Sequence, residues 1–133
     1  MYFEDLTPYQ YGGEEPDGAV LNIGWLSRAH SYPRGETSRE FIAALQRMVA
    51  NPVNLYRGSH VCEFCPEPPV TLRNGRKWIE PAPGTTGNGE VRVNEAGGPT
   101  YVAPALVLHY IQVHAYLPPE PFIKAVLAHH EAA

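Results

Sequence analysis

The sequence has little charge, little cysteine and no long hydrophobic run. Only 18% of its 133 residues are charged, and 10 Lys and Arg against 14 Asp and Glu give a formal net charge of −4. The basic residues are scattered apart from a small group at Arg73, Arg76 and Lys77, so we expect no nucleic acid partner, because phosphate binding needs a concentrated basic surface. No apolar stretch approaches the roughly 20 residues that span a bilayer, and the N-terminus is acidic and aromatic, unlike a signal peptide. We therefore expect no membrane partner and a cytoplasmic protein.

The composition is typical of one folded domain. Hydrophobic residues make up 44% of the chain, which is too many for a disordered protein. The 14 prolines and 12 glycines fall mostly in the first 35 residues and between residues 66 and 104, which predicts long ordered loops. We expect a single globular domain over residues 1–133, with residues 1–18 as an aromatic arm packed on the core. The oligomeric state stays open.

Hydrophobic periodicity predicts an α+β fold. A short apolar run at residues 19–26 predicts a strand, and the capping-box spacing of Thr37 and Glu40 predicts the start of a helix that ends before Asn51-Pro52. Short strands are expected at residues 70–72, 76–79, 90–94 and 99–103. The glycine-rich residues 84–89 are expected to form a turn. Two further helices are expected over residues 105–116, with Pro104 at the first helical position, and over residues 121–130. The prediction is a small antiparallel sheet with about three helices and long proline-rich loops.

Both cysteines lie close together, in the stretch Ser59-His60-Val61-Cys62-Glu63-Phe64-Cys65. Two thiolates separated by two residues can bind one zinc ion, because a tight turn directs both sulfurs the same way. The histidines His109 and His114 have the spacing of a zinc-finger histidine pair and could complete a tetrahedral site. The sequence therefore predicts a structural Zn²⁺ held by Cys62, Cys65, His109 and His114, which ties a loop to a helix.

Two other ligand sets stay open. Five positions along an α-helix turn through about 500°, so the imidazoles of His109 and His114 would point about 140° apart on a regular helix. A set of His60, Cys62, Cys65 and either His109 or His114 avoids this difficulty. The pair His129 and His130, near the end of the chain, is less suited to ligate. All these residues could also be ordinary core or surface side chains with no metal.

Three functional hypotheses follow from the cysteine pair. The favoured one is a zinc-stabilised, non-catalytic interaction protein that binds a protein partner. The second is a metal-dependent hydrolase with three zinc ligands and Glu63 or Glu67 as general base, but the HExxH spacing is absent and two thiolates make bound water a poorer nucleophile. The third is a thiol redox sensor, which the prolines after Cys65 disfavour, because they oppose the helix that activates a CxxC thiol. No catalytic residue is predicted.

The segments MYFEDLTPYQY, NIGWLSRAH, RGSHVCEFCPEP, GEVRV and YVAPALVLHYIQVHAYLPPEPF together resemble an uncharacterised family of small bacterial proteins, grouped as a domain of unknown function. The resemblance covers nearly the whole chain. It implies a single bacterial domain in which HVCEFC and HYIQVH recur as signature blocks. It therefore supports Cys62, Cys65, His109 and His114 as site residues, and it implies no activity.

Overall fold

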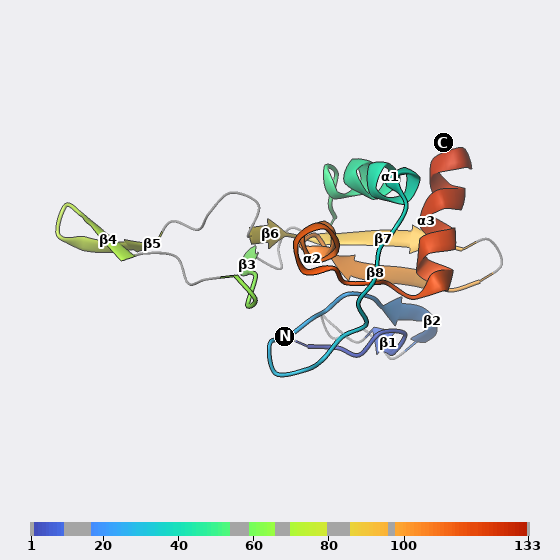
Figure 1. The fold of residues 1–133 in the computed structure, drawn as a ribbon, viewed down its shortest axis with the longest axis horizontal. Helices are drawn as coiled ribbons and strands as arrows, with labels where there is room; N and C mark the ends of the chain where they lie inside the picture. Colours follow the sequence, from blue (N-terminus) through green and yellow to red (C-terminus); the bar gives the residue numbers. More distant parts are fainter. Residues whose placement is uncertain are drawn as a thin grey trace.

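The fold combines small β-sheets with helices in one α+β domain. The structure is a computed structural model and describes residues 2–9, 17–53, 59–65, 70–79, 86–95 and 98–132. In chain order its elements are β1 (Pro8–Tyr9), β2 (Asp17–Asn22), α1 (Arg39–Val49), β3 (Ser59–Val61), β4 (Val70–Arg73), β5 (Arg76–Ile79), β6 (Thr86–Asn88), β7 (Glu90–Asn94), β8 (Thr100–Pro104), α2 (Val107–His114) and α3 (Glu120–Ala132), as Figure 1 shows. The predicted fold class is confirmed. None of the helices in the described ranges has the length and apolar character to cross a membrane.

The main sheet is mixed, so the expectation of a purely antiparallel sheet is wrong. Its strand order is β1-β2-β8-β7. β7 and β8 pair antiparallel, as expected, but β2 pairs parallel to β8, with Val20 opposite Thr100. A parallel pair needs a long crossover connection, and here the chain between β2 and β8 contains α1 and the cysteine loop. Local hydrophobic periodicity does not predict the direction of a strand that follows such a crossover.

Strand β8 is the centre of the domain because both of its faces are covered. Tyr101 and Val102 are 2% and 0% exposed. On one face the ring of Tyr101 meets that of Phe122 from α3 at 6.1 Å. On the other, Val102 joins a small cluster with Trp25, against which Phe3 packs. The N-terminal residues thus cover the second face of the sheet.

Helix α1 forms where the sequence predicts it, although its cap differs by one residue. The Ser38 hydroxyl, and not that of Thr37, accepts a hydrogen bond from the Phe41 amide at 3.2 Å. The buried residues Phe41, Ala44 and Leu45 lie on one face of the helix, as their spacing predicts. Helix α1 packs on α3, α2 and β7 with this face.

Helix α2 is shorter than the prediction of residues 105–116. Pro104 ends β8, where it lies opposite Glu90, and does not start a helix. At the other end, Ala115 takes a left-handed conformation with φ of 55°, and the Tyr116 amide donates to the Tyr110 carbonyl at 3.1 Å. A left-handed residue whose own and following amides bond back to the last turn commonly ends a helix, so α2 ends at His114 well before Pro118.

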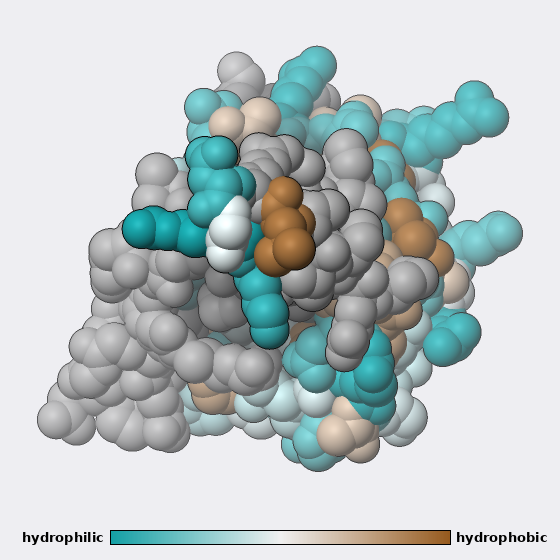
Figure 2. Space-filling view, turned by 90° about the vertical axis from the view of Figure 1, so that its left-hand side faces the viewer, coloured by the Kyte–Doolittle hydropathy of each residue, from teal (hydrophilic) through white to brown (hydrophobic). Residues whose placement is uncertain are grey.

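Two short antiparallel ribbons lie outside the main sheet. Residues 86–88, expected to be part of a turn, form β6 and pair with β3 just before the cysteines. Strands β4 and β5, both expected from the sequence, pair as a hairpin around Asn74-Gly75, whose φ values of 51° and 76° suit a two-residue turn. Figure 1 places this hairpin at the left-hand end, far from α3. Figure 2 views that end and shows a hydrophobic group beside hydrophilic ones. The Leu72 side chain is 74% exposed.

Partly buried hydrogen bonds join the N-terminal segment to the segment after α2. The Asp5 carboxylate accepts hydrogen bonds from the Gly24 amide at 2.9 Å and from the Tyr116 hydroxyl at 2.8 Å. Tyr116 is fully buried. Burial is the largest influence on Asp5 and raises the pKa of its carboxyl, while both hydrogen bonds lower it. These hydrogen bonds fix Tyr116, which lies two residues beyond His114.

We expect Gly24→Ala to destabilise the domain by about 2 to 5 kcal/mol. Gly24 has a φ of 71°, which an L side chain adopts at a cost of about 1 to 3 kcal/mol, and a Cβ there would lie 2.8 Å from Val107 Cγ2. Urea denaturation followed by circular dichroism measures the loss. Gly75→Ala is the matched control, because Gly75 has a φ of 76° but no atom within 4 Å of the added Cβ. Equal losses in the two variants would contradict the steric part of the prediction.

We expect Tyr116→Phe to cost about 1 to 2 kcal/mol at pH 7 and less near pH 4. The raised pKa of Asp5 means that the folded state holds this proton more tightly than the unfolded state, so the stability contributed by Asp5 falls as pH rises through that pKa. Loss of the hydroxyl donor raises the pKa further and enlarges the deficit where Asp5 is ionised. Urea midpoints of variant and wild type at both pH values test this; a deficit that grows toward pH 4 would contradict it.

Candidate metal centre

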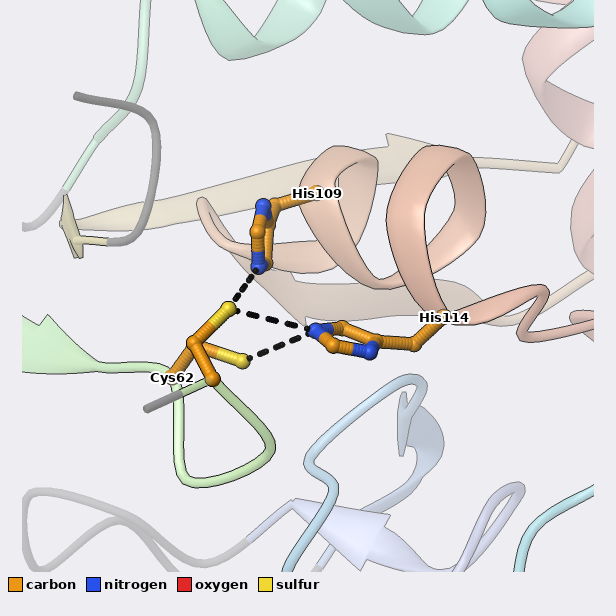
Figure 3. A group of neighbouring side chains, drawn as sticks. Cys62, His109 and His114 are labelled. Carbon is orange, nitrogen blue, oxygen red and sulfur yellow. Dashed lines mark hydrogen bonds between the residues drawn. The ribbon is translucent and has the colours of Figure 1, made fainter. Parts of the chain in front are cut away.

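The four predicted ligands come from two segments that are far apart in sequence. Cys62 directly follows β3, and residues 62–65 form a tight turn that returns Cys65 toward it. His109 lies in the first half of α2 and His114 is the last residue of that helix. Figure 3 shows both imidazoles pointing from α2 toward the sulfur atoms of the loop.

The donor atoms converge on a single point between the loop and the helix. Cys62 Sγ lies 3.3 Å from His114 Nε2, and Cys65 Sγ lies 3.3 Å from His109 Nε2 and 3.5 Å from His114 Nε2. One donor atom from each of the four residues lies within 4.8 Å of all the others. The group can therefore hold a metal ion.

These separations are close to those around a tetrahedral ion. With Zn–S bonds of about 2.3 Å and Zn–N bonds of about 2.0 to 2.1 Å, tetrahedral angles put neighbouring donors about 3.3 to 3.8 Å apart. For a sulfur–nitrogen pair this geometry gives about 3.5 to 3.6 Å. The 3.5 Å contact agrees with that value, and the two 3.3 Å contacts are slightly shorter. Two thiolates and two imidazoles are also the donor set of a closed structural zinc site. The four residues therefore fit a zinc ion.

Hydrogen bonding alone accounts for the cluster less well. Each thiol carries one hydrogen and each neutral imidazole carries one, whereas Cys65 Sγ approaches two ring nitrogens and His114 Nε2 approaches two sulfurs. If each thiol donates to one Nε2, the remaining contact between Cys65 and His114 brings two lone pairs together; if His114 carries its proton on Nε2, that one N–H is shared between two sulfurs. An ion in the middle accepts all four lone pairs at once.

The protonation states favour metal binding by the histidines. Desolvation lowers the pKa of His109, and the charge of His114 lowers it further; desolvation lowers the pKa of His114, and the charge of Arg34 adds to it. Both imidazoles are thereby held neutral, which is the form that ligates. Desolvation, together with the Cys62 thiol, raises the pKa of Cys65. The metal itself would have to stabilise the thiolate.

The positions of the two rings remove the objection to the histidine spacing. On a continuous helix the two imidazoles diverge by about 140°. Here His114 precedes a left-handed Ala115, and its ring centroid lies 5.0 Å from that of His109. The two imidazoles therefore meet beside the C-terminal end of α2 in spite of this spacing.

Aromatic and cationic side chains outside the donor set contact the ligands or the backbone next to them. The Tyr32 hydroxyl donates to the His114 carbonyl at 2.9 Å. Phe64, between the two cysteines, has its ring centroid 5.3 Å from those of both Tyr32 and His114. Arg28 donates through Nε to the Glu63 carbonyl at 2.7 Å and through Nη2 to the same oxygen. Sequence reasoning missed Tyr32 and Arg28, which no spacing links to the cysteines, while Phe64 could have been found from its place inside the CxxC.

The remaining sequence candidates do not join the cluster of described side chains. Glu63 is exposed, as expected for a residue between two ligands. His129 lies in α3 beside a cavity against α1 and β7, away from the cysteines. His60 belongs to β3, but its side chain, like that of His130, lies outside the described side chains, and Glu67 lies outside the described residues.

Comparisons with known proteins give a family and no function. Residues 1–127 match the model of the family described as Domain of unknown function (DUF7919). Neither the search of curated proteins nor the search of solved structures returned a match. Since the matched range covers nearly all of the 133 residues, the chain belongs to this uncharacterised DUF7919 family.

Proposed function

We propose that the chain is a zinc-binding domain whose metal is structural, and that it acts as a non-catalytic interaction protein. The observation that carries the proposal is the convergence of Cys62, Cys65, His109 and His114 on one point from two distant segments. Two thiolates and two imidazoles suit the borderline-soft Zn²⁺ better than they suit Mg²⁺ or Ca²⁺, which prefer oxygen. Zinc held there fastens the cysteine loop to α2.

A structural role is favoured over hydrolysis because four protein donors fill a tetrahedral ion. A catalytic site keeps one position for water and places a general base beside it. The donor cluster contains no carboxylate among the described residues, and Glu63 faces solvent. The reducing cytoplasm would suit the site, because both cysteines are free thiols and zinc requires thiolates.

Elemental analysis tests the metal directly. We expect about one zinc per chain in the purified wild type and a stoichiometry near zero in Cys65→Ser. Substitution with Co²⁺ then counts ligands: a tetrahedral site with two thiolates gives intense visible absorption that added azide or phosphate leaves unchanged, because no position is open. His129→Ala is the control, since His129 is exposed on α3. Zinc-free wild type would overturn the proposal, and a spectrum that shifts with azide would favour the hydrolase.

A protein partner is supported by the β4–β5 hairpin. Leu72 is 74% exposed, and Arg76 and Lys77 beside it are exposed cations in a chain of net charge −4. Exposed apolar surface rimmed by charge fits a partner with an acidic surface. Zinc-loaded wild type should retain an acidic protein in a pull-down experiment. Once purified, that protein should bind Leu72→Ser and Lys77→Glu at least about tenfold more weakly than it binds wild type. Equal binding by both variants would overturn this role of the hairpin.

A further inference from the structure

A cavity beside the metal centre concentrates positive charge. It has a volume of about 360 Å³, and its lining includes Arg28, His30, Tyr32, Arg34 and Phe64. Ligand sites for small molecules begin at about 300 Å³. No Asp or Glu is among the described residues that line it. In a chain with a net charge of −4, such a lining is unusual and favours an anion.

The two arginines keep their charge available. Arg28 is bound by the backbone carbonyl of Glu63, which is a neutral acceptor. Arg34 lies over the Tyr32 ring with its guanidinium carbon 4.9 Å from the ring centroid. Within the described part of the chain, neither guanidinium pairs with a carboxylate. Both side chains are exposed and present nitrogen donors that match the oxygens of a phosphate group.

The walls of the cavity are aromatic. The rings of Tyr32 and Phe64 meet edge to face at 5.3 Å, and His30 is stacked on Tyr2 at 3.8 Å. Such rings favour a planar, apolar body over a wholly polar one. Two guanidinium charges match a dianion better than a singly charged carboxylate.

From this lining we propose that the cavity binds a phosphate monoester with an aromatic body, its phosphate between Arg28 and Arg34 and its ring against Tyr32 and Phe64. The proposal rests on the structural metal inferred above. Arg28 is tied to the loop between the cysteines, and the backbone of Arg34 bridges to Tyr116, just beyond His114. The metal would therefore assemble the cavity by fixing the segments that hold its two cations.

Calorimetric titration of the zinc-loaded chain with phenyl phosphate tests this assignment. We expect saturable binding, with inorganic phosphate and benzoate at least about tenfold weaker, because each lacks either the ring or the second charge. Arg34→Gln should weaken phenyl phosphate at least about tenfold, and Arg34→Lys should recover part of that loss. Lys124→Gln, an exposed cation on α3, is the matched control and should bind as wild type does.

The outcomes separate the cavity from the metal. Zinc content is measured on every variant, and Arg34→Gln should retain wild-type zinc. Chelator-treated wild type should bind phenyl phosphate at least about tenfold more weakly. Zinc-loaded wild type that gives no saturable binding, or that binds equally after Arg34→Gln, would overturn the ligand site and leave the metal centre standing. Equal binding by the stripped chain would overturn the assembly of the cavity by the metal.

Discussion

Removal of zinc with a chelator is expected to lower the thermal unfolding midpoint of the domain by at least about 15 °C. Structural zinc contributes roughly 10 to 16 kcal/mol in finger peptides, whereas whole domains are stable by about 5 to 15 kcal/mol. Because this chain also has a core of its own, part of the fold can persist. A loss of at least about 4 kcal/mol corresponds to such a shift at this chain length.

The loss of structure should begin where the proposed metal would join the cysteine loop to α2. Cys62 is 3% exposed and belongs to the main core cluster, with Phe64 packed against it. Without an ion, the loop is held to α2 only by weak sulfur–nitrogen hydrogen bonds, two of which share the single Nε2 of His114. Near-ultraviolet circular dichroism reports on Tyr32, Phe64 and Tyr110 around the site and should decrease before the helical signal does.

Cys62→Ser provides the matched comparison for chelation. It should show the lowered midpoint without chelator and no further change with it, because the site is already lost. Zinc added back should restore the stripped wild type and leave the variant unchanged. Equal midpoints for the native and the stripped wild type would contradict a structural role for the metal.

Local sequence patterns predict more of the candidate metal centre than of the sheet. The CxxC and the two histidines could be read from type and spacing, because zinc selects its ligands by chemistry. Their convergence could not, since side chains five residues apart on a helix are expected to diverge and the end of α2 at a left-handed Ala115 was not expected. Alanine seldom takes this conformation, so the sequence had no marker for it. The support by Tyr32 and Arg28 likewise depends on tertiary contacts.

The helices and strands show the same difference between local and tertiary signals. Helix α1 was predictable because Phe41, Ala44 and Leu45 recur at helical spacing behind polar capping residues. The parallel pairing of β2 with β8 was not, because the long crossover places no signal in either strand. The sequence of the short strand β6, Thr86–Asn88, predicts a turn, since its Gly and Asn residues have low strand propensity and β3 alone pairs with it among the described strands.

Phe122→Ala is expected to cost about 3 to 5 kcal/mol through a cavity in the core. Phe122 is fully buried, and its ring lies edge to face with Phe41 at 6.2 Å and with Tyr101 at 6.1 Å. The residue joins α3 to both α1 and the sheet. Urea denaturation of the zinc-loaded protein measures the loss, and Val113→Ala, at a residue 61% exposed, should change stability by less than about 0.5 kcal/mol.

This variant also separates the core from the metal, because an ion that binds only the folded state stabilises it by mass action. At a free concentration of about 100 times the dissociation constant, zinc adds about 2.7 kcal/mol. Excess zinc should therefore raise the unfolding midpoint of Phe122→Ala, whose four ligands are intact, and should leave that of Cys62→Ser unchanged. If excess zinc shifted neither variant, the metal would not be linked to folding; if it shifted both equally, Cys62 would not be a ligand.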